Sequence, residues 1–576
     1  MLSKRIKAAK GDVPADLVLK NGKVINVFTL EAESLDVAVC DGMIVGLGNY
    51  DGINEVDCSG KYIAPGFIDG HIHLESSMMK PAEFAKTVLP HGTTTVITDP
   101  HEIANVCGCE GIDYMIQATK GLPLDVYFAL PSCVPSTPLD ESGACLDAED
   151  LKTYYQNENV VGLAEVMNYI GVINGDSHVL RKIEDALKED KVIDGHAPGL
   201  SGKDLCAYLT AGVQSDHECS NAKEGMERIR RGQWVMIREG TAAKNLEDLI
   251  SLFEYPYNQR TMLVTDDKHP GDLLNFGHID YIIRKAISLG ANPFAAIKMA
   301  TFNAATYFDL KHRGAIAPNY LADLVILSDL ESVQIERVYK KGQLIAREGK
   351  ALFFKENEVD LKLNDKVSHS FDMAALTPES FCLNQKKNRD IQKLRVISLQ
   401  AGQIMTNELL EDYHFETDGI DVEKDIIKLA VIERHLHTGH IGLGYIHGYG
   451  LKSGAIASSV AHDAHNLIVA GTNEADMALA ANTVREMQGG WVIVCNEEVI
   501  DKLPLPIAGL MSDLDADTLE KKIAAMKIAA KKQGVSDLID PFMTLAFVSL
   551  PVIPVLKLTT HGLVDVEKQC VVEAGF

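Results

Sequence analysis

Short apolar runs that end at a histidine or a carboxylate recur along the first half of the chain. The clearest is segment 65–73, PGFIDGHIH, in which an apolar run leads into two histidines. Residues i and i+2 of an extended segment share a face, so His71 and His73 can present two imidazoles to one cation. Later runs end at Glu165, His196, His217 and Asp266. This recurrence, rather than one His-x-His motif, indicates a metal site at the ends of strands.

The spacing of these runs predicts eight strands, at 63–69, 93–98, 125–130, 160–164, 191–194, 211–214, 233–237 and 261–265. Between them, segments such as 226–231 and 246–254 carry apolar residues at helical spacing. Parallel strands need crossover connections of this length. We therefore predict an α/β fold with a (β/α)8, TIM-like barrel over residues 66–309. In such a barrel the functional residues lie at the carboxyl ends of the strands.

The segments on both sides of the barrel predict a small β-domain. Residues 15–46 alternate in polarity and contain Asn21-Gly22 and Asp41-Gly42, dipeptides typical of hairpin turns. Residues 322–327 and 338–345 have the same character, so we expect 1–65 and 310–355 to form one composite β-sandwich domain. The polar segment 356–393 predicts a connection. Residues 394–576 predict a C-terminal α/β or α+β domain, with strands at 467–470 and 491–495 around a helix at 474–488.

The composition narrows the class of protein. A chain of 576 residues exceeds the usual size of a single core. Its 55 basic and 81 acidic residues give a formal charge of −26, which argues against nucleic-acid and anionic membrane partners and suits a small neutral substrate. The N-terminus lacks the apolar core of a signal peptide, and prolines interrupt the longest apolar stretch, around 542–556. The 11 cysteines then predict reduced thiols and a cytoplasmic location.

Several motifs resemble one known family. The strand-end series follows the order found in the amidohydrolase superfamily: His71, His73, Glu165, His196, His217 and Asp266. Segments TDPHEIANV (98–106), SDHE (215–218), REG (238–240), TDDKHP (265–270) and AHDAHN (461–466) resemble the adenine deaminases of that superfamily, and the similarity runs from end to end. One departure is Glu165, because many binuclear relatives carry a carboxylated lysine there. A glutamate can also bridge two metals.

The resemblance implies a hydrolase of purine salvage that converts adenine and water to hypoxanthine and ammonia. It also implies two divalent cations, with one bound by His71, His73 and Asp266, the other by His196 and His217, and Glu165 bridging both. Histidines and carboxylates without a thiolate admit manganese, iron and zinc, and the family favours manganese or iron. Asp266 would accept a proton from the activated water and deliver it to the leaving amine.

Nitrogen N1 of the purine ring also needs a proton donor. The candidates close to strand ends are Asp99, His101, Glu102, Glu218 and Asp267, and each of them can equally orient a ligand histidine. Arg238 and Glu239, together with Glu218, are expected either at the imidazole edge of a closed pocket for the free base or in structural ion pairs. A homo-oligomer is the usual state for such an enzyme.

Two other functions are weighed on the same fold. A cyclic-amide or N-acyl hydrolase uses the same fold but lacks a long C-terminal region, whereas a non-catalytic scaffold would be expected to have lost ligands. A helical zinc-protease site is excluded, because Asn105 and Asn221 replace the second histidine of His-Glu-x-x-His. The C-terminal histidines either form a second metal site, structure a loop or face the barrel mouth: His435, His437, His440, His447, His462 and His465.

Overall fold

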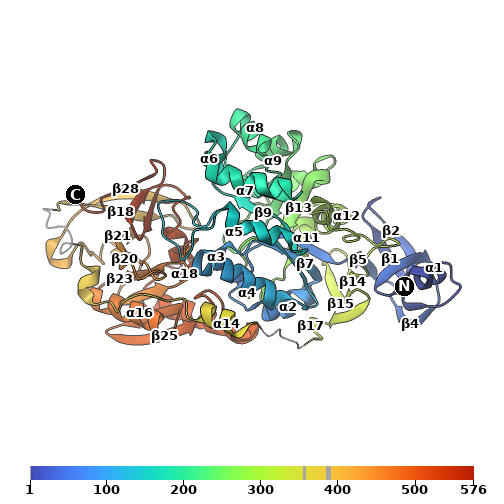
Figure 1. Cartoon of the computed structure of the whole chain (residues 1–576). Coiled ribbons are helices and arrows are strands. Elements are labelled where there is room, and N and C mark those ends of the chain that lie inside the picture. The colour runs from blue at the N-terminus through green and yellow to red at the C-terminus, as the bar shows by residue number, and fades with distance from the viewer. Residues whose placement is uncertain (1, 354–358, 384–390) are drawn as a thin grey trace.

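The computed structural model describes residues 2–353, 359–383 and 391–576. The barrel occupies the middle of an elongated molecule, with a sheet that includes the N-terminal strands at one end and the C-terminal half at the other (Figure 1). Helix α1 (Leu2–Ala9) packs against the sheet that includes the N-terminal strands. The predicted connection at 356–393 lies partly outside the described residues. In its described part, α14 (Leu361–Ser368) packs against the barrel helix α4 (Cys109–Thr119).

Eight parallel strands form the barrel. They are arranged as a five-stranded sheet, β10-β9-β8-β7-β6, and a three-stranded sheet, β11-β12-β13. Two backbone bonds join the sheets, because the Gln214 N–H donates to Ile193 O at 2.8 Å and the Asp266 N–H donates to His71 O at 3.0 Å. The strands are β6 (Phe67–Ile72), β7 (Thr93–Thr98), β8 (Asp125–Leu130), β9 (Val160–Val166), β10 (Val192–Gly195), β11 (Ser215–Asp216), β12 (Trp234–Arg238) and β13 (Thr261–Val264).

Helices between and after these strands cover the barrel. Apolar side chains from several barrel strands, such as Ile68, Ile97 and Met236, form one buried cluster with Tyr307 and Phe308. This packing leaves the carboxyl ends of the strands to polar residues. The other helices are α2 (Pro81–Val88), α3 (His101–Cys107), α5 (Ala148–Lys152), α6 (Tyr169–Asn174), α7 (Ser177–Lys188), α8 (Gly202–Thr210), α9 (Ala222–Arg230), α10 (Pro270–Asn275), α11 (Ile279–Ser288), α12 (Pro293–Met299) and α13 (Phe302–Tyr307).

Two predicted strands differ from the observed ones. The strand expected at 63–69 is divided, because β5 (Tyr62–Pro65) joins the flanking sheet and β6 begins after Gly66. A Cβ at Gly66 would lie 2.3 Å from Thr94 Oγ1, so only glycine fits at this division. The strand expected at 211–214 was placed too early. That segment is the turn after α8, with Gly212 at φ 107°, and the strand is Ser215–Asp216.

The prediction of a helix at 246–254 was wrong. The segment forms turns followed by the 3-10 helix η4 (Ile250–Phe253). Leu246, Leu249 and Leu252 are fully buried, the first two in the turns and the third in η4. The helix expected at 226–231 is confirmed, with bounds that differ slightly, by α9.

Strands from both flanks of the barrel form one nine-stranded sheet, ordered β17-β16-β15-β14-β5-β1-β2-β3, with β4 paired to β1. Asp41-Gly42 forms the predicted turn between β2 and β3, with positive φ at both residues. Asn21-Gly22 is instead a bulge within β1, where the Asn21 N–H donates to the Asp36 carboxylate. The remaining strands are β1 (Ala15–Asn26), β2 (Glu31–Cys40), β3 (Met43–Gly48), β4 (Gly52–Asp57), β14 (Leu324–Asp329), β15 (Gln334–Lys340), β16 (Gln343–Arg347) and β17 (Lys350–Ala351).

The C-terminal half contains an eight-stranded sheet, ordered β19-β18-β21-β20-β23-β22-β24-β25, and a three-stranded sheet, β26-β27-β28. Helix α16 (Glu474–Glu486) lies between β23 and β24 in the sequence, as predicted; α17 (Ala516–Lys532) and α18 (Pro541–Val548) follow. The strands are β18 (Lys393–Leu399), β19 (Thr406–Asp412), β20 (Ile426–Ile432), β21 (Ile441–His447), β22 (Ala455–Ser458), β23 (Leu467–Gly471), β24 (Gly490–Cys495), β25 (Glu498–Pro504), β26 (Leu556–Thr559), β27 (Gly562–Asp565) and β28 (Cys570–Val572).

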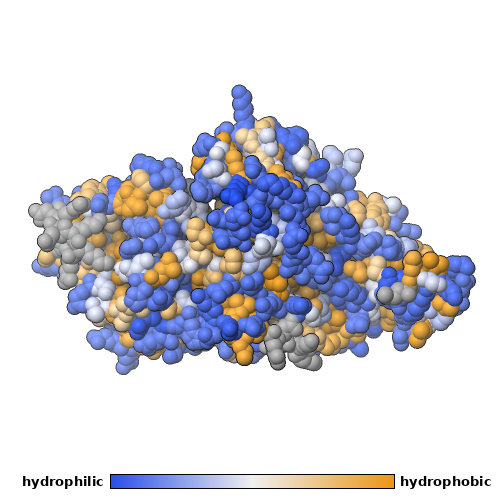
Figure 2. All heavy atoms as spheres, in the orientation of Figure 1, coloured by the Kyte–Doolittle hydropathy of each residue, from blue (hydrophilic) through white to orange (hydrophobic). Residues whose placement is uncertain are grey.

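The face of the molecule in Figure 2 is mainly hydrophilic, with apolar side chains in separate patches. This surface agrees with the formal charge of −26. Among the described residues, no helix combines the length and the apolar character needed to cross a bilayer.

Candidate active site

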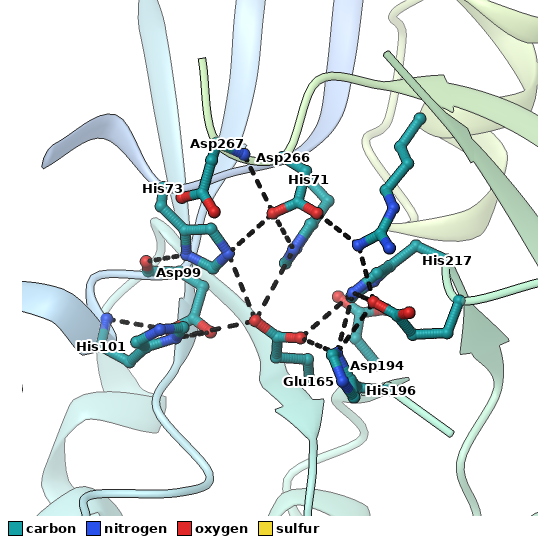
Figure 3. A network of polar contacts seen from close by, with 12 residues as sticks. His71, His73, Asp99, His101, Glu165, Asp194, His196, His217, Asp266 and Asp267 are labelled. Atoms are coloured by element: carbon teal, nitrogen blue, oxygen red, sulfur yellow. Dashed lines mark hydrogen bonds and ion pairs between the residues drawn. The ribbon is translucent and has the colours of Figure 1, made fainter. Parts of the chain in front are cut away.

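Six polar side chains meet at the carboxyl ends of the barrel strands (Figure 3). His71 is the penultimate residue of β6, His73 directly follows that strand, and Glu165 lies near the end of β9. The other three directly follow or closely follow β10, β11 and β13: His196, His217 and Asp266. All except His196 are buried. The barrel therefore brings together the complete series that the sequence suggested.

The Glu165 carboxylate lies between two pairs of histidines. Its Oε1 is 3.2 Å from His73 Nε2 and 3.9 Å from His71 Nε2. Its Oε2 is 2.7 Å from His196 Nδ1 and 3.2 Å from His217 Nε2. Burial opposes ionisation of Glu165, but the facing imidazoles, led by His217, hold its pKa well below the usual value. A carboxylate with one oxygen toward each histidine pair has the geometry of a bridging ligand.

Asp266 lies against the first histidine pair and is also fixed by an arginine. Its Oδ1 is 3.2 Å from His73 Nε2, while its Oδ2 accepts a hydrogen bond from Arg238 Nη1 at 2.6 Å. Arg238 Nη1 also lies 2.6 Å from Glu218 Oε1. Burial raises the pKa of Asp266, but Arg238 and His73 outweigh that effect and hold it well below the usual value. Asp266 is thus an oriented, ionised carboxylate.

The donor set fits divalent cations. His71 Nε2 is buried and has no hydrogen-bond partner among the described residues, although it faces Glu165 and Asp266 at 3.9 and 4.0 Å. His73 Nδ1 lies 3.2 Å from the backbone oxygen of Asp99, and donation there leaves Nε2 free to bind a metal. Imidazole and carboxylate donors together suit manganese, iron and zinc.

Further acid–base groups surround these side chains. His101 Nδ1 lies 2.8 Å from Asp99 Oδ2 and 3.8 Å from Glu165 Oε1. Asp267 Oδ1 accepts a hydrogen bond from Ser76 Oγ at 2.5 Å. Burial, followed by the neighbouring charge of Asp266, raises the pKa of Asp267. The two adjacent aspartates therefore differ in pKa: that of Asp266 is lowered, which keeps it ionised, and that of Asp267 is raised, which makes it easier to protonate.

A cavity of about 300 Å³ opens beside this cluster. Its barrel wall includes His73, Glu165, Asp266, Glu218 and Arg238. Its other wall comes from the C-terminal half and is largely apolar; we call it the apolar cover, and it consists of Ile404, Met405, Phe547, Leu550, Val552, Ile553 and Pro554. A mostly apolar cavity with a few convergent polar groups is typical of a small-molecule site.

Comparison with known proteins identifies the family. Residues 62–345 match the Amidohydrolase family, and residues 403–570 match the Adenine deaminase C-terminal domain. Adenine deaminase 2 of Carboxydothermus hydrogenoformans is 47% identical over 98% of this chain and 98% of its own. The chain belongs to the adenine deaminase family. The adenine deaminase of Petrotoga mobilis is 46% identical over 97% of both chains, and that of Kosmotoga olearia is 46% identical over 97% of this chain and 96% of its own.

Two of the candidate substrate-contact residues, Asp99 and Glu239, are not on the cavity wall of this adenine deaminase family member. Asp99 instead contacts His101, with Oδ2 2.8 Å from Nδ1. Glu239 is fully buried, and its carboxylate is 3.1 Å from Lys285 Nζ. It is not part of the cavity wall, whereas Arg238 and Glu218 are. The sequence left two roles open for Glu239, and the structure places it in the second of them, a structural ion pair.

Of the three roles left open for the C-terminal histidines, facing the barrel mouth describes His462. The apolar cover and the barrel partner of His462 were missed by the sequence analysis. His462 and Asp463 lie on the cavity wall, and His462 contacts Glu102 of the barrel. The AHDAHN motif at 461–466 was the available signal, since a polar motif between apolar segments requires buried partners. The apolar cover gives no comparable signal, because its residues come from separate segments without a shared period.

Proposed function

We propose that this chain hydrolyses adenine to hypoxanthine and ammonia. The observation that supports this most directly is the ionised Glu165, which lies between two histidine pairs at the wall of a covered cavity. The names of the full-length relatives support adenine as the substrate. We place the reaction in purine salvage in the cytoplasm and expect a homo-oligomer, the usual state of such enzymes.

Two divalent cations are part of the proposal. His71, His73 and Asp266 would hold one, His196 and His217 the other, and Glu165 would bridge both. Manganese or iron is preferred, and the donor set also admits zinc. When bound, such a pair supplies a nucleophile at neutral pH by lowering the pKa of a water from about 15.7 toward 7.

Asp266 is proposed as the proton carrier. Its Oδ2 is fixed by Arg238, whereas its Oδ1 is directed toward His73. As an ionised carboxylate on the cavity wall, it can accept a proton from the attacking water and deliver it to the amine that leaves C6. The water oxygen remains on C6 and becomes the carbonyl oxygen of hypoxanthine, because its second proton replaces the one that a separate acid gives to ring nitrogen N1. The amine departs as ammonia.

Protonation of ring nitrogen N1 needs a separate acid. Asp267 suits this role because it lies on the cavity wall and burial raises its pKa. His101 is a second candidate, since it contacts Asp99 and also lies on the wall. Glu102 is less suited to donate a proton, because the two neighbouring histidines favour its ionised form.

The cavity favours a free base over a nucleoside. At about 300 Å³ it can enclose a purine, and the side chains of the apolar cover offer no hydrogen-bond partner to the hydroxyl groups of a ribose. Glu218 and Arg238 supply polar contacts on its wall for the imidazole edge of the base. A site that hydrogen-bonds a ring N–H strongly discriminates against an analogue that lacks it.

The proposal is tested by ammonia release from the manganese-loaded protein. Adenine, adenosine, a hydantoin and an N-acetylated sugar phosphate should be assayed in parallel. Turnover of adenine alone is the expected result. Turnover of the hydantoin or the acetylated sugar without turnover of adenine would instead assign the chain to the cyclic-amide or N-acyl hydrolases.

A further inference from the structure

A buried cluster joins the barrel to the C-terminal half beside the cavity. Glu102, at the start of α3, lies 2.7 Å from His462 Nδ1 through its Oε1 and contacts His465 Nε2 through its Oε2. The exposed fractions of Glu102, His462 and His465 are 2%, 7% and 1%. The carboxylate and the two imidazoles thus come from opposite sides of the interface, and each group is removed from water.

These three residues could hold a metal by type and distance, since their ligand atoms lie within 4.8 Å of one another. The hydrogen bonding of His465 argues against this function. Its Nδ1 accepts a hydrogen bond from the Ala461 N–H at 3.1 Å, so a neutral ring carries its proton on Nε2. A metal-bound histidine instead donates its other ring N–H to an acceptor. His465 is therefore a hydrogen-bond donor to Glu102.

The segment that carries the two histidines is firmly held. The buried Arg434 donates through Nε to the His465 backbone oxygen at 2.6 Å. Asn466 Nδ2 donates to the Glu141 backbone oxygen at 2.6 Å, which attaches the segment to the loop after β8. Phe547 of the apolar cover stacks on His462 with ring centroids 4.8 Å apart. These contacts hold the segment of His462 and His465 in place through groups other than Glu102.

Glu102 faces the substrate cavity, whereas His465 does not. Glu102 and His462 belong to the cavity wall, while His465 lies behind it, beside a separate void of about 20 Å³. Burial alone would favour a neutral Glu102, but His462 and His465 hold its pKa well below the usual value. His465 therefore lies one residue away from a bound substrate, behind Glu102 and behind His462, whose ring centroid is 5.6 Å from that of His465.

We infer that His465 and His462 are positioning residues that hold the Glu102 carboxylate as a fixed acceptor in the substrate cavity. The acceptor suits an N–H of a purine, so this inference rests on the proposed function. It means that the barrel alone does not contain the complete site. The C-terminal half supplies the two shortest contacts of the Glu102 carboxylate, because its barrel neighbour His101 lies farther away, with Nε2 3.6 Å from Oε1.

The test is a double-mutant cycle between His465 and Glu102. His465→Leu removes the donor, and we expect it to lower kcat/KM by about 100-fold, the effect of a displaced positioning group. Glu102→Gln should give a similar loss, and the double variant should be no worse than Glu102→Gln alone. His465→Gln, whose amide nitrogen can take the place of Nε2, should recover most of the activity. His437→Leu is the matched control, because His437 lies on the surface and pairs with Asp372.

Two measurements separate this positioning role from other roles. A merely structural role would lower the melting temperature but give additive losses of kcat/KM, which would overturn the inference. Loss of one metal equivalent on His465→Leu would show instead that the cluster binds a cation. His465→Asn, which is polar but too short to reach Glu102, replaces His465→Leu if the latter does not fold. Wild-type turnover of adenine tests the proposed function separately, and the cycle can be measured on any substrate that the wild type converts.

Discussion

Substitution of Asp266 by asparagine tests the proposed proton carrier. The asparagine retains the shape of Asp266 but must turn its amide nitrogen toward one of two partners. In one orientation it meets Arg238 Nη1, now 2.6 Å from Oδ2, donor against donor. In the other it faces His73 Nε2, now 3.2 Å from Oδ1, and offers no lone pair to a cation. Either orientation of the amide removes one charged contact of residue 266, and neither provides a carboxylate that can accept a proton from water.

The expected loss of kcat follows from these changes. Removal of a general acid–base group costs about 10²–10⁴-fold, equivalent to about 3–5 kcal/mol at roughly 1.4 kcal/mol per tenfold change. Ammonia release at saturating adenine measures this loss, and metal analysis of the same sample separates it from lost occupancy. Asp267→Asn is the matched control, with a smaller effect expected if His101 can also supply the ring proton. The reasoning fails if Asp266→Asn remains within tenfold of wild type, or if Asp267→Asn alone is inactive.

Three further results are expected. Glu165→Gln should lower both bound metal and turnover, because it removes the anionic oxygen between the histidine pairs; wild-type metal content with a wild-type rate would exclude a bridging role. Adenine should be converted about 10⁴-fold faster than adenosine, and comparable rates would refute the closed pocket. Burial lowers the pKa of Lys557 from 10.5 to about 7, so the unfolded chain binds more protons between these values. Wild-type stability should therefore rise relative to Lys557→Met as pH increases from about 7 to 10, and a pH-independent difference in melting temperature would contradict this.

The barrel and its ligand-type residues could be predicted because both have local signals. Each ligand-type residue lies in or soon after a short apolar run, and parallel strands place their carboxyl ends together. His71 and His73 remain neighbours although the predicted strand is divided at Gly66. The errors at 211–214 and 246–254 arose where apolar spacing alone did not determine the type of element. In the second segment, Leu246 and Leu249 are buried in turns and Leu252 is buried in a 3-10 helix, although their spacing also suits an α-helix.

The remaining features depend on tertiary contacts that no local pattern encodes. The sequence motif at 461–466 indicates a constrained segment but does not identify Glu102 as its partner, more than 350 positions earlier in the chain. Asn21-Gly22 has the composition of a hairpin turn, yet its backbone is paired through the Asp36 side chain within a longer strand. Glu239 directly follows Arg238, yet it pairs with Lys285 while Arg238 enters the cavity wall.

The two halves of the molecule supply different parts of the candidate site. The barrel supplies the six ligand-type residues and the charged pair of Arg238 with Asp266, all of which can act on water and on the leaving amine. The C-terminal half supplies the apolar cover and the donors to Glu102, which can act only on the bound heterocycle. Changes in the C-terminal half should therefore alter the choice and orientation of substrate more than metal content. This division explains why the ligand series alone could not separate adenine deamination from cyclic-amide hydrolysis, whereas the covered cavity supports the first.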